Sequence, residues 1–547
     1  MDMNGRGISI GRETRLLALT GGLLMTAALA FGGAGSLTVK LEQPLERTMR
    51  YHFDNMQRFD VTNAEPMDLS RAAGVKFELR CEDPSVLTGC WLLFKTGDGY
   101  YRAAAEIPPK AGVWTEVTVL RKGVRLYHWN THISRCELEA DPKPTDLPDW
   151  RRVSGFQIVF SLAIDRTSPD ATVSARGFEP VAEGSAEARA AEEAFAAAER
   201  RRTDEVAAFP SRSGERRFLA THVYGLDWDW DATCRMLAER GITDVIPLTS
   251  YAGRSYFKSA FEPPHALIDR KGDALRQCIA ACRKHGLKCH PWRCSWVLGE
   301  VLNETDKAEL VRDKRLQVGF DGQFHPDHFL CPTHPVNVRH EIEAMMELAD
   351  MGASGVMLDY FRYANRKFCY CERCREKFES TLGRRLSDWP KCLTADAELN
   401  VKWQAFRRGV LTEILRTVRA EMRRRAPQVE LSAALFAVIE GAYEVGQDWP
   451  SWGKEGLLDF MFPMCYFSSA KQLKREVGRL QDATRGAKGK LVPMISLACG
   501  AIPFNDPVEI ARQISVVRGA GIDDLAFFRL EEYLPYAFDM LRKGPLK

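Results

Sequence analysis

From residue 216 onward, short apolar runs alternate with long amphipathic segments, and few folds accommodate such a repeat. The apolar runs are "RFLATHVYG", "DVIPLTS", "KCHPWRC", "GVMLDYF", "VELSAALF", "DFMFPMCYF", "KLVPMISLA" and "DLAFFRL". Between them lie segments such as "ALRQCIAACRKHG", whose apolar residues recur every three or four positions, as in a helix. Gly241, Gly286, Gly352 and Gly521 stand where helix C-terminal caps are expected. Eight strand-helix units over residues 216–547 predict a (β/α)8 TIM barrel.

The chain before the barrel has a different pattern. Residues 37–182 contain short alternating runs such as "GVKFELRC", "CWLLFKT" and "FQIVFSLAI", separated by turn residues, which is typical of an antiparallel β-sandwich of the jelly-roll kind. Residues 183–215 are rich in Ala, Glu and Arg and predict a helical connector. We therefore expect a multidomain protein in which a β-sandwich precedes a barrel.

The N-terminus has the pattern of a secretory signal peptide. Arg6, Arg12 and Arg15 precede the apolar run "LLALTGGLLMTAALAF", and Ala28 and Ala30 offer a cleavage site. The run is shorter than the roughly 20 residues that span a bilayer, which disfavours the alternative of an uncleaved anchor. We expect residues 1–36 to be a leader and the mature protein to be periplasmic or extracellular, with no stable membrane span.

The charge balance argues against a nucleic-acid partner. The 76 Lys and Arg residues nearly match the 73 Asp and Glu residues, which leaves a formal charge of +3. The densest basic run, "RAEMRRRAP", fits the solvated end of a helix.

A TIM barrel places its active site at the C-terminal ends of its strands. The polar and aromatic residues that follow the apolar runs are therefore candidates, and carboxylates, aromatic rings and cations together suit sugars. The predicted substrate-binding residues on this rim are His222, Tyr224, His290, Trp292, Arg362, Trp449, Tyr466 and Glu531.

Four blocks of sequence carry a family resemblance. They are "CPTHPVNVRHEIEAMMELADMGASGVMLDYFRY", "VKWQAFRRGVLTEILRTVRAEMRRRAPQVELSAALF", "GQDWPSWGKEGLLDFMFPMCYF" and "GIDDLAFFRLEEY". In this order they resemble the glycosyl-hydrolase-like family 10, whose members are secreted bacterial barrel proteins associated with glycans. Relatives usually have Asn in a "Leu-Asn-Pro" segment where this chain has Cys331, and often Pro where it has Ala364, so the role of that Asn is not carried over.

Asp359 is the first candidate for catalysis. It directly follows "GVML", a run too apolar to tolerate an ionised group unless the carboxylate emerges at the strand end. We expect Arg362 to keep Asp359 ionised, as suits a nucleophile or a stabiliser of the transition state. The structural alternative is that the two residues form an ion pair that only orders the loop.

A glycosidase needs a second carboxyl group to protonate the leaving oxygen. Asp448 is the first choice, because it follows the fifth strand and has Trp449 and Trp452 beside it to exclude water. The alternative is that Asp448 only caps the helix that starts near Pro450. Glu440 and Glu531 are the reserve candidates.

The chain contains 15 cysteines, and three of them are clustered. Cys369, Cys371 and Cys374 form a Cys-x-Cys-x-x-Cys motif that predicts either a closed structural zinc site or disulfides. Cys392 is the nearest candidate in sequence for a fourth zinc ligand. Cys81 and Cys90 are close enough in sequence to bridge a hairpin in the first domain.

Two classes of function fit these residues. The first is an exported glycoside hydrolase that acts on a polysaccharide or cell-wall glycan, has no catalytic cofactor, and carries an N-terminal sandwich resembling a carbohydrate-binding module. The second is a non-catalytic glycan-binding protein that uses the same rim. Several carboxylates at rim positions favour the enzyme.

Overall fold

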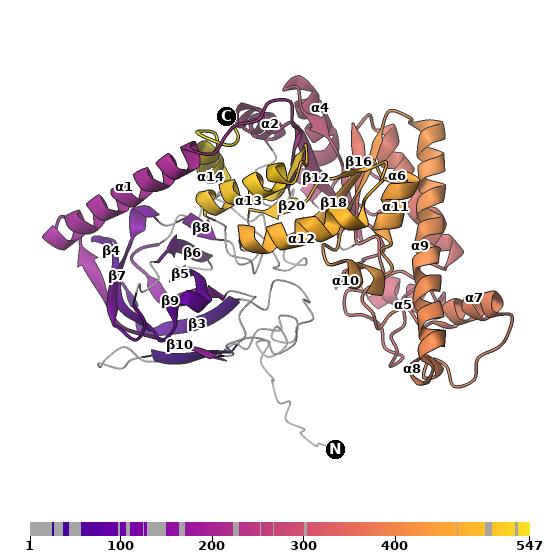
Figure 1. Ribbon diagram of the computed structural model, residues 1–547, viewed down its shortest axis with the longest axis horizontal. Coiled ribbons are helices and arrows are strands. Elements are labelled where there is room, and N and C mark those ends of the chain that lie inside the picture. Colours follow the sequence, from indigo (N-terminus) through magenta and orange to yellow (C-terminus); the bar gives the residue numbers. More distant parts are fainter. Residues whose placement is uncertain are drawn as a thin grey trace, which may run out of the picture. The chain divides into compact units, whose positions relative to one another are not determined.

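The computed structural model is drawn in Figure 1. It describes residues 25–26, 37–42, 56–96, 99–105, 110–123, 125–127, 149–162, 170–221, 229–251, 253–265, 267–299, 304–467, 469–497, 506–530 and 534–547. The predicted signal peptide, apart from residues 25–26, lies outside these residues. Among the helices of the described part, none is both long and apolar enough to cross a bilayer.

The N-terminal region forms two sheets. The six-stranded sheet runs in the order β1 (Met25–Thr26), β3 (Met56–Met67), β9 (Val153–Leu162), β5 (Leu87–Thr96), β6 (Gly99–Ala104) and β8 (Arg125–Tyr127). The four-stranded sheet runs β2 (Leu37–Glu42), β10 (Asp170–Ala182), β4 (Ala72–Cys81) and β7 (Thr115–Leu120). All neighbouring strands are antiparallel except the short β1–β3 pair.

These two sheets share one hydrophobic core, as the alternating sequence predicts. Along β4 mostly every second side chain is buried, which is the pattern of a strand with one face on a core. Phe77 of β4 stacks on Phe178 of β10 with ring centroids 4.7 Å apart, and Phe178 stacks on Phe156 of the other sheet at 5.3 Å. Short 3-10 helices at Pro84–Val86 and Arg121–Gly123 complete this region.

Helix α1 (Ala186–Ala207) lies in the predicted connector. The boundary between the two compact units of the chain falls inside it, after Ala197.

The second unit contains a closed barrel of eight parallel strand positions, which confirms the predicted fold class. In sequence order the strands are β11 (Arg217–Thr221), β12 (Asp244–Tyr251), β14 (Lys288–Cys289) with β15 (Trp292–Cys294), β16 (Gly355–Asp359), β17 (Glu430–Leu435), β18 (Phe460–Cys465), β19 (Lys490–Leu491) with β20 (Met494–Ser496), and β21 (Leu525–Leu530). Each pairs in parallel with the next, and β11 pairs with both β12 and β21, which closes the barrel. A two-residue strand, β13 (Arg254–Ser255), pairs antiparallel with the end of β12.

The helices of this unit follow the strands. They are α2 (Trp230–Glu239), α3 (Leu267–Lys271), α4 (Ala274–Lys284), α5 (Glu304–Arg312), α6 (Pro335–Asp350), α7 (Glu372–Leu382), α8 (Cys392–Ala395), α9 (Ala397–Arg425), α10 (Ile439–Glu444), α11 (Trp449–Glu455), α12 (Ala470–Ala483), α13 (Pro507–Gly519) and α14 (Leu534–Leu541). Asp229, Asp273 and Asp396 cap their helices through side-chain bonds to backbone N–H groups. The predicted cap glycines, Gly241, Gly286, Gly352 and Gly521, all have positive φ.

Candidate active site and thiol cluster

Asp359 is the last residue of β16, at the C-terminal end of the barrel. The four residues before it are fully enclosed, whereas Asp359 itself is partly exposed. Its Oδ1 accepts a hydrogen bond from the backbone N–H of Tyr360 at 2.6 Å, and its Oδ2 accepts one from the indole N–H of Trp292 at 3.1 Å. The carboxyl group is thus held by two neutral donors.

Burial raises the pKa of Asp359 to about 6, although Arg362 and the two hydrogen bonds act in the opposite direction. This corrects the expectation that Arg362 keeps the group ionised. Desolvation outweighs the cation, because the carboxyl group sits at the end of an apolar strand. A carboxyl group with this pKa is still partly protonated near neutral pH, which suits a proton donor better than a nucleophile.

The Arg362 guanidinium donates hydrogen bonds to the loop that follows Asp359. It donates to the backbone carbonyls of Tyr363 and Ala364, at 3.2 and 2.9 Å. It also lies 4.8 Å from the ring of Tyr360 and 5.0 Å from the ring of Phe436. Arg362 therefore organises the loop after β16 and acts on Asp359 only through its charge.

A chain of three aromatic rings leads away from Asp359 and joins non-adjacent strands of the barrel. Trp292 on β15 meets Phe528 on β21 edge to face, with centroids 5.7 Å apart. Phe528 stacks on Tyr466, just after β18, at 4.9 Å and 22°. Trp292 is only 4% exposed and bonds to Asp359, so it is better described as a positioning residue than as a sugar platform. Our sequence reasoning missed Phe528, although its place near the end of the eighth apolar run was an available signal.

His290 is a correction to the predicted rim. Its Nε2 lies 2.8 Å from Oδ1 of Asp244, the first residue of β12, and 3.9 Å from Glu430, the first residue of β17. Arg216, which precedes β11, binds both of these carboxylates. The histidine therefore belongs to a charged network at the N-terminal end of the barrel, opposite Asp359. The sequence misled us because the third strand is broken into β14 and β15, and His290 falls at the break.

Asp448 lies on the C-terminal side of the barrel, where it precedes α11. It occupies the N-cap position, yet its side chain makes no capping hydrogen bond, so the capping alternative lacks its defining contact. Trp449 is fully buried and donates its indole N–H to the carbonyl of Phe436 at 3.2 Å. The predicted sugar contact of Trp449 is therefore corrected to a packing role.

Of the two reserve carboxylates, only Glu440 lies among the described residues. Glu440 is exposed and pairs with Arg479 at 2.6 Å. Glu531 lies outside the described residues, as do the predicted rim residues His222 and Tyr224.

Four cysteine sulfurs gather behind the loop that follows Asp359. Those of Cys331, Cys369, Cys371 and Cys374 all lie within 4.8 Å of one another. Cys331 lies 3.6 Å from both Cys371 and Cys374, whereas a disulfide bond would be about 2.05 Å long. Four thiolates at about 2.3 Å from a tetrahedral Zn²⁺ would be about 3.8 Å apart, so the cluster fits a zinc ion.

The fourth member corrects the choice of Cys392. Cys331 comes from the segment before α6, and Cys392 lies in α8 outside the group. Cys331 thus supplies the fourth thiol of the cluster. Donors also surround the sulfurs: Val318 gives its backbone N–H to Cys369 at 3.3 Å, and the Thr333 hydroxyl lies 3.1 Å from the Cys331 sulfur. The expected bridge in the first domain is absent, because Cys81 and Cys90 are buried free thiols.

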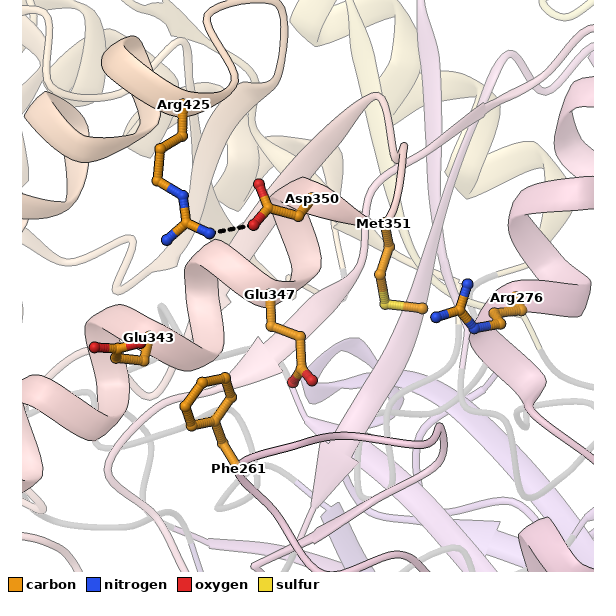
Figure 2. A pocket seen from close by; sticks show the side chains of 7 residues that line it. All are labelled: Phe261, Arg276, Glu343, Glu347, Asp350, Met351 and Arg425. Atoms are coloured by element: carbon orange, nitrogen blue, oxygen red, sulfur yellow. Dashed lines mark hydrogen bonds and ion pairs between the residues drawn. The ribbon is translucent and has the colours of Figure 1, made fainter.

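A separate pocket of 350 Å³ opens in the helical layer. Figure 2 shows its acidic residues Glu343, Glu347 and Asp350 on α6, with Asp350 joined to Arg425. Neither Asp359 nor any predicted sugar-binding residue lines it.

The chain thus combines a closed eight-stranded parallel barrel with a partly exposed acid at the C-terminal end of its fourth strand. Residues 233–500, from α2 to the loop after β20, match the sequence model of the family Glycosyl hydrolase-like 10. This match confirms the resemblance seen in the four sequence blocks.

One solved structure shows the same fold at low identity. The glycoside hydrolase domain of PgaB (BpsB) from Bordetella bronchiseptica is 14% identical with a TM-score of 0.50, and the match covers 61% of this chain and 99% of that one. The alpha-L-fucosidase isoenzyme 2 from Paenibacillus thiaminolyticus is 14% identical with a TM-score of 0.42, covering 60% of this chain and 48% of that one. No curated protein matches the chain.

Proposed function

We propose that this protein hydrolyses a glycosidic bond of a polysaccharide or cell-wall glycan, with Asp359 as the proton donor. The observation that carries the proposal is the partly exposed carboxyl group at the end of β16, whose pKa burial raises to about 6. At neutral pH a useful fraction of this group holds a proton that it can deliver to the leaving oxygen. The family of residues 233–500 and the PgaB domain support a glycan as the substrate.

The second carboxylate in this proposal is Asp448, now as base or nucleophile. This reverses the two roles suggested by the sequence, because Asp359 is the group with the raised pKa. Asp448 follows the strand next to that of Asp359, on the same side of the barrel, and its side chain is not used as a helix cap.

Leaving-group dependence tests both roles. We would measure turnover of wild type, Asp359→Asn and Asp448→Asn on a polysaccharide panel and on 2,4-dinitrophenyl glycosides, which need little protonation of the leaving group. Asp359→Asn should lose roughly 10²–10⁴-fold on the natural glycan and far less on the activated glycoside. Asp448→Asn should lose activity on both. Glu398→Gln, an exposed acid on α9, is the matched control.

Two results would contradict this assignment. Equal losses of Asp359→Asn on both substrates would remove Asp359 as the proton donor. Wild-type protein that binds glycans without turning over any of them would instead establish the non-catalytic glycan-binding protein.

We also propose a division of the chain that is consistent with this activity. A leader of residues 1–36 is removed on export, the sandwich occupies 37–182, a connector spans 183–215, and residues 216–547 form the catalytic barrel. The arginines before the apolar run in the leader support export.

We also propose that Cys331, Cys369, Cys371 and Cys374 bind one structural Zn²⁺. The mutual distances of the sulfurs support this ion over disulfides. All four positions are taken by protein ligands, so the ion would brace the loop after β16 and take no part in the chemistry.

A further inference from the structure

A second group of cysteines precedes the first in the sequence. The sulfurs of Cys234, Cys278 and Cys282 all lie within 4.8 Å of one another. Cys289 adjoins this group, with its sulfur 3.9 Å from that of Cys278. All four side chains are at most 2% exposed.

The local structure explains why these sulfurs meet. Cys278 and Cys282 are four residues apart on α4 and share one face of that helix. Cys234 comes from α2, which packs against α4 beside the barrel (Figure 1). Cys289 is the last residue of β14, which follows α4 in the chain. Two helices therefore bring three thiols together, and the strand places a fourth thiol beside that of Cys278.

The spacing of the sulfurs identifies the class of ligand. Cys234 and Cys282 are 3.7 Å apart, and Cys278 and Cys282 are 3.9 Å apart. The edge of a tetrahedral zinc thiolate site is about 3.8 Å, from Zn–S bonds of about 2.3 Å. Unbonded thiols at these distances are not disulfides. The two printed sulfur pairs of the first cluster are 3.6 Å apart, close to the spacing of Cys234, Cys278 and Cys282.

We propose that Cys234, Cys278 and Cys282 form a second Zn²⁺ site. Cys289, whose sulfur lies 3.9 Å from that of Cys278 but outside the 4.8 Å group, would move in as the fourth ligand and join α2 and α4 to the barrel sheet. Thiolate ligands select soft, thiophilic ions such as Zn²⁺. Binding replaces the four thiol protons, which are released to solvent, with one metal ion. The site has no open position and acts on stability, independently of the proposed glycosidase activity.

Metal counting on the full chain tests the proposal. Protein purified without chelators should contain about two zinc ions per chain by elemental analysis, one for each cluster. Cys282→Ser should reduce the content to about one, and so should Cys374→Ser in the first cluster. Cys465→Ser, which removes a fully buried thiol outside both clusters, should leave about two and is the matched control.

The second cluster can also be examined alone, in Cys374→Ser protein. Replacing its remaining zinc with Co²⁺ should give thiolate-to-cobalt charge-transfer absorption. A wild-type content of only one zinc that disappears in Cys374→Ser would overturn the second site. Zinc content of one together with a loss of titratable thiols in denatured wild-type protein would show disulfides instead, and would overturn it too. The wild-type count decides the matter even if a variant does not fold.

Discussion

Trp292 and Asp359, on neighbouring strands of the barrel, form one hydrogen-bonded unit. The indole N–H of Trp292 lies 3.1 Å from Oδ2 of the acid, and the parallel pairing of β15 with β16 places Trp292 opposite Met357, two residues before Asp359. The hydrogen bond from this neutral donor lowers the pKa of Asp359, but burial of the carboxyl group raises it by a larger amount. The Trp292 side chain therefore affects the pKa of Asp359 and also packs against Phe528, which stacks on Tyr466.

Replacing Trp292 by Phe should move the pH dependence of turnover. The substitution removes the donor to Asp359, so the pKa of the acid rises further, and the alkaline limb of kcat/KM should shift to higher pH. A pH profile of wild type and Trp292→Phe measures this. A lower rate with an unshifted alkaline limb would mean that Trp292 acts only through packing.

Asp359→Asn should stabilise the folded protein at neutral pH. The carboxyl group titrates near 6 when folded and near 4 when unfolded, so the folded state binds more protons between these values and stability falls as pH rises through them. Above about pH 6 the penalty is complete, and removing the charge should return about 1–3 kcal/mol. The gain should vanish below about pH 4. Urea unfolding of both proteins from pH 3 to 8, with Glu398→Gln as control, would show whether the gain depends on pH in this way.

Asp244→Asn should have the opposite effect. Burial alone would raise the pKa of Asp244, but hydrogen bonds from His290 and Arg216 outweigh it and lower this pKa to about 2. A depressed folded pKa gives stability that is present above about pH 4 and is lost as the pH falls towards 2. The variant should be less stable by about 2–3 kcal/mol at pH 7 and should approach wild type at pH 2. An equal difference at both pH values would show that shape, and not ionisation, holds this network.

Loss of the first thiol cluster should lower the stability of the barrel and leave the turnover of the folded protein largely unchanged. Cys374→Ser should release one zinc ion and lower the melting temperature of the barrel, while the protein that remains folded keeps its turnover. Differential scanning calorimetry with parallel activity assays measures both. A collapse of kcat in fully folded Cys374→Ser protein would show instead that the loop after β16 places a catalytic group.

The sequence alone determined the barrel architecture and identified Asp359 as the main candidate acid. The eight strand-helix units could be read because buried strands and amphipathic helices impose different spacings on apolar residues, and those spacings survive without knowledge of the fold. Asp359 could be identified in the same way. A single acid that follows four apolar residues can reach solvent only if it lies at the end of the strand. The Cys-x-Cys-x-x-Cys motif was equally visible, because its three ligands are close in the chain.

Only the tertiary structure decided which distant residues meet and how each environment changes their chemistry. Cys331 joins its cluster from 38 positions before Cys369, and Cys234 meets Cys282 across two helices. The predicted position of His290 at the C-terminal end of the barrel was wrong, because the break between β14 and β15 cannot be recognised from the sequence. The pKa of Asp359 reversed its expected role, because the balance between desolvation and the charge of Arg362 depends on burial and distance, and the order of residues in the chain specifies neither.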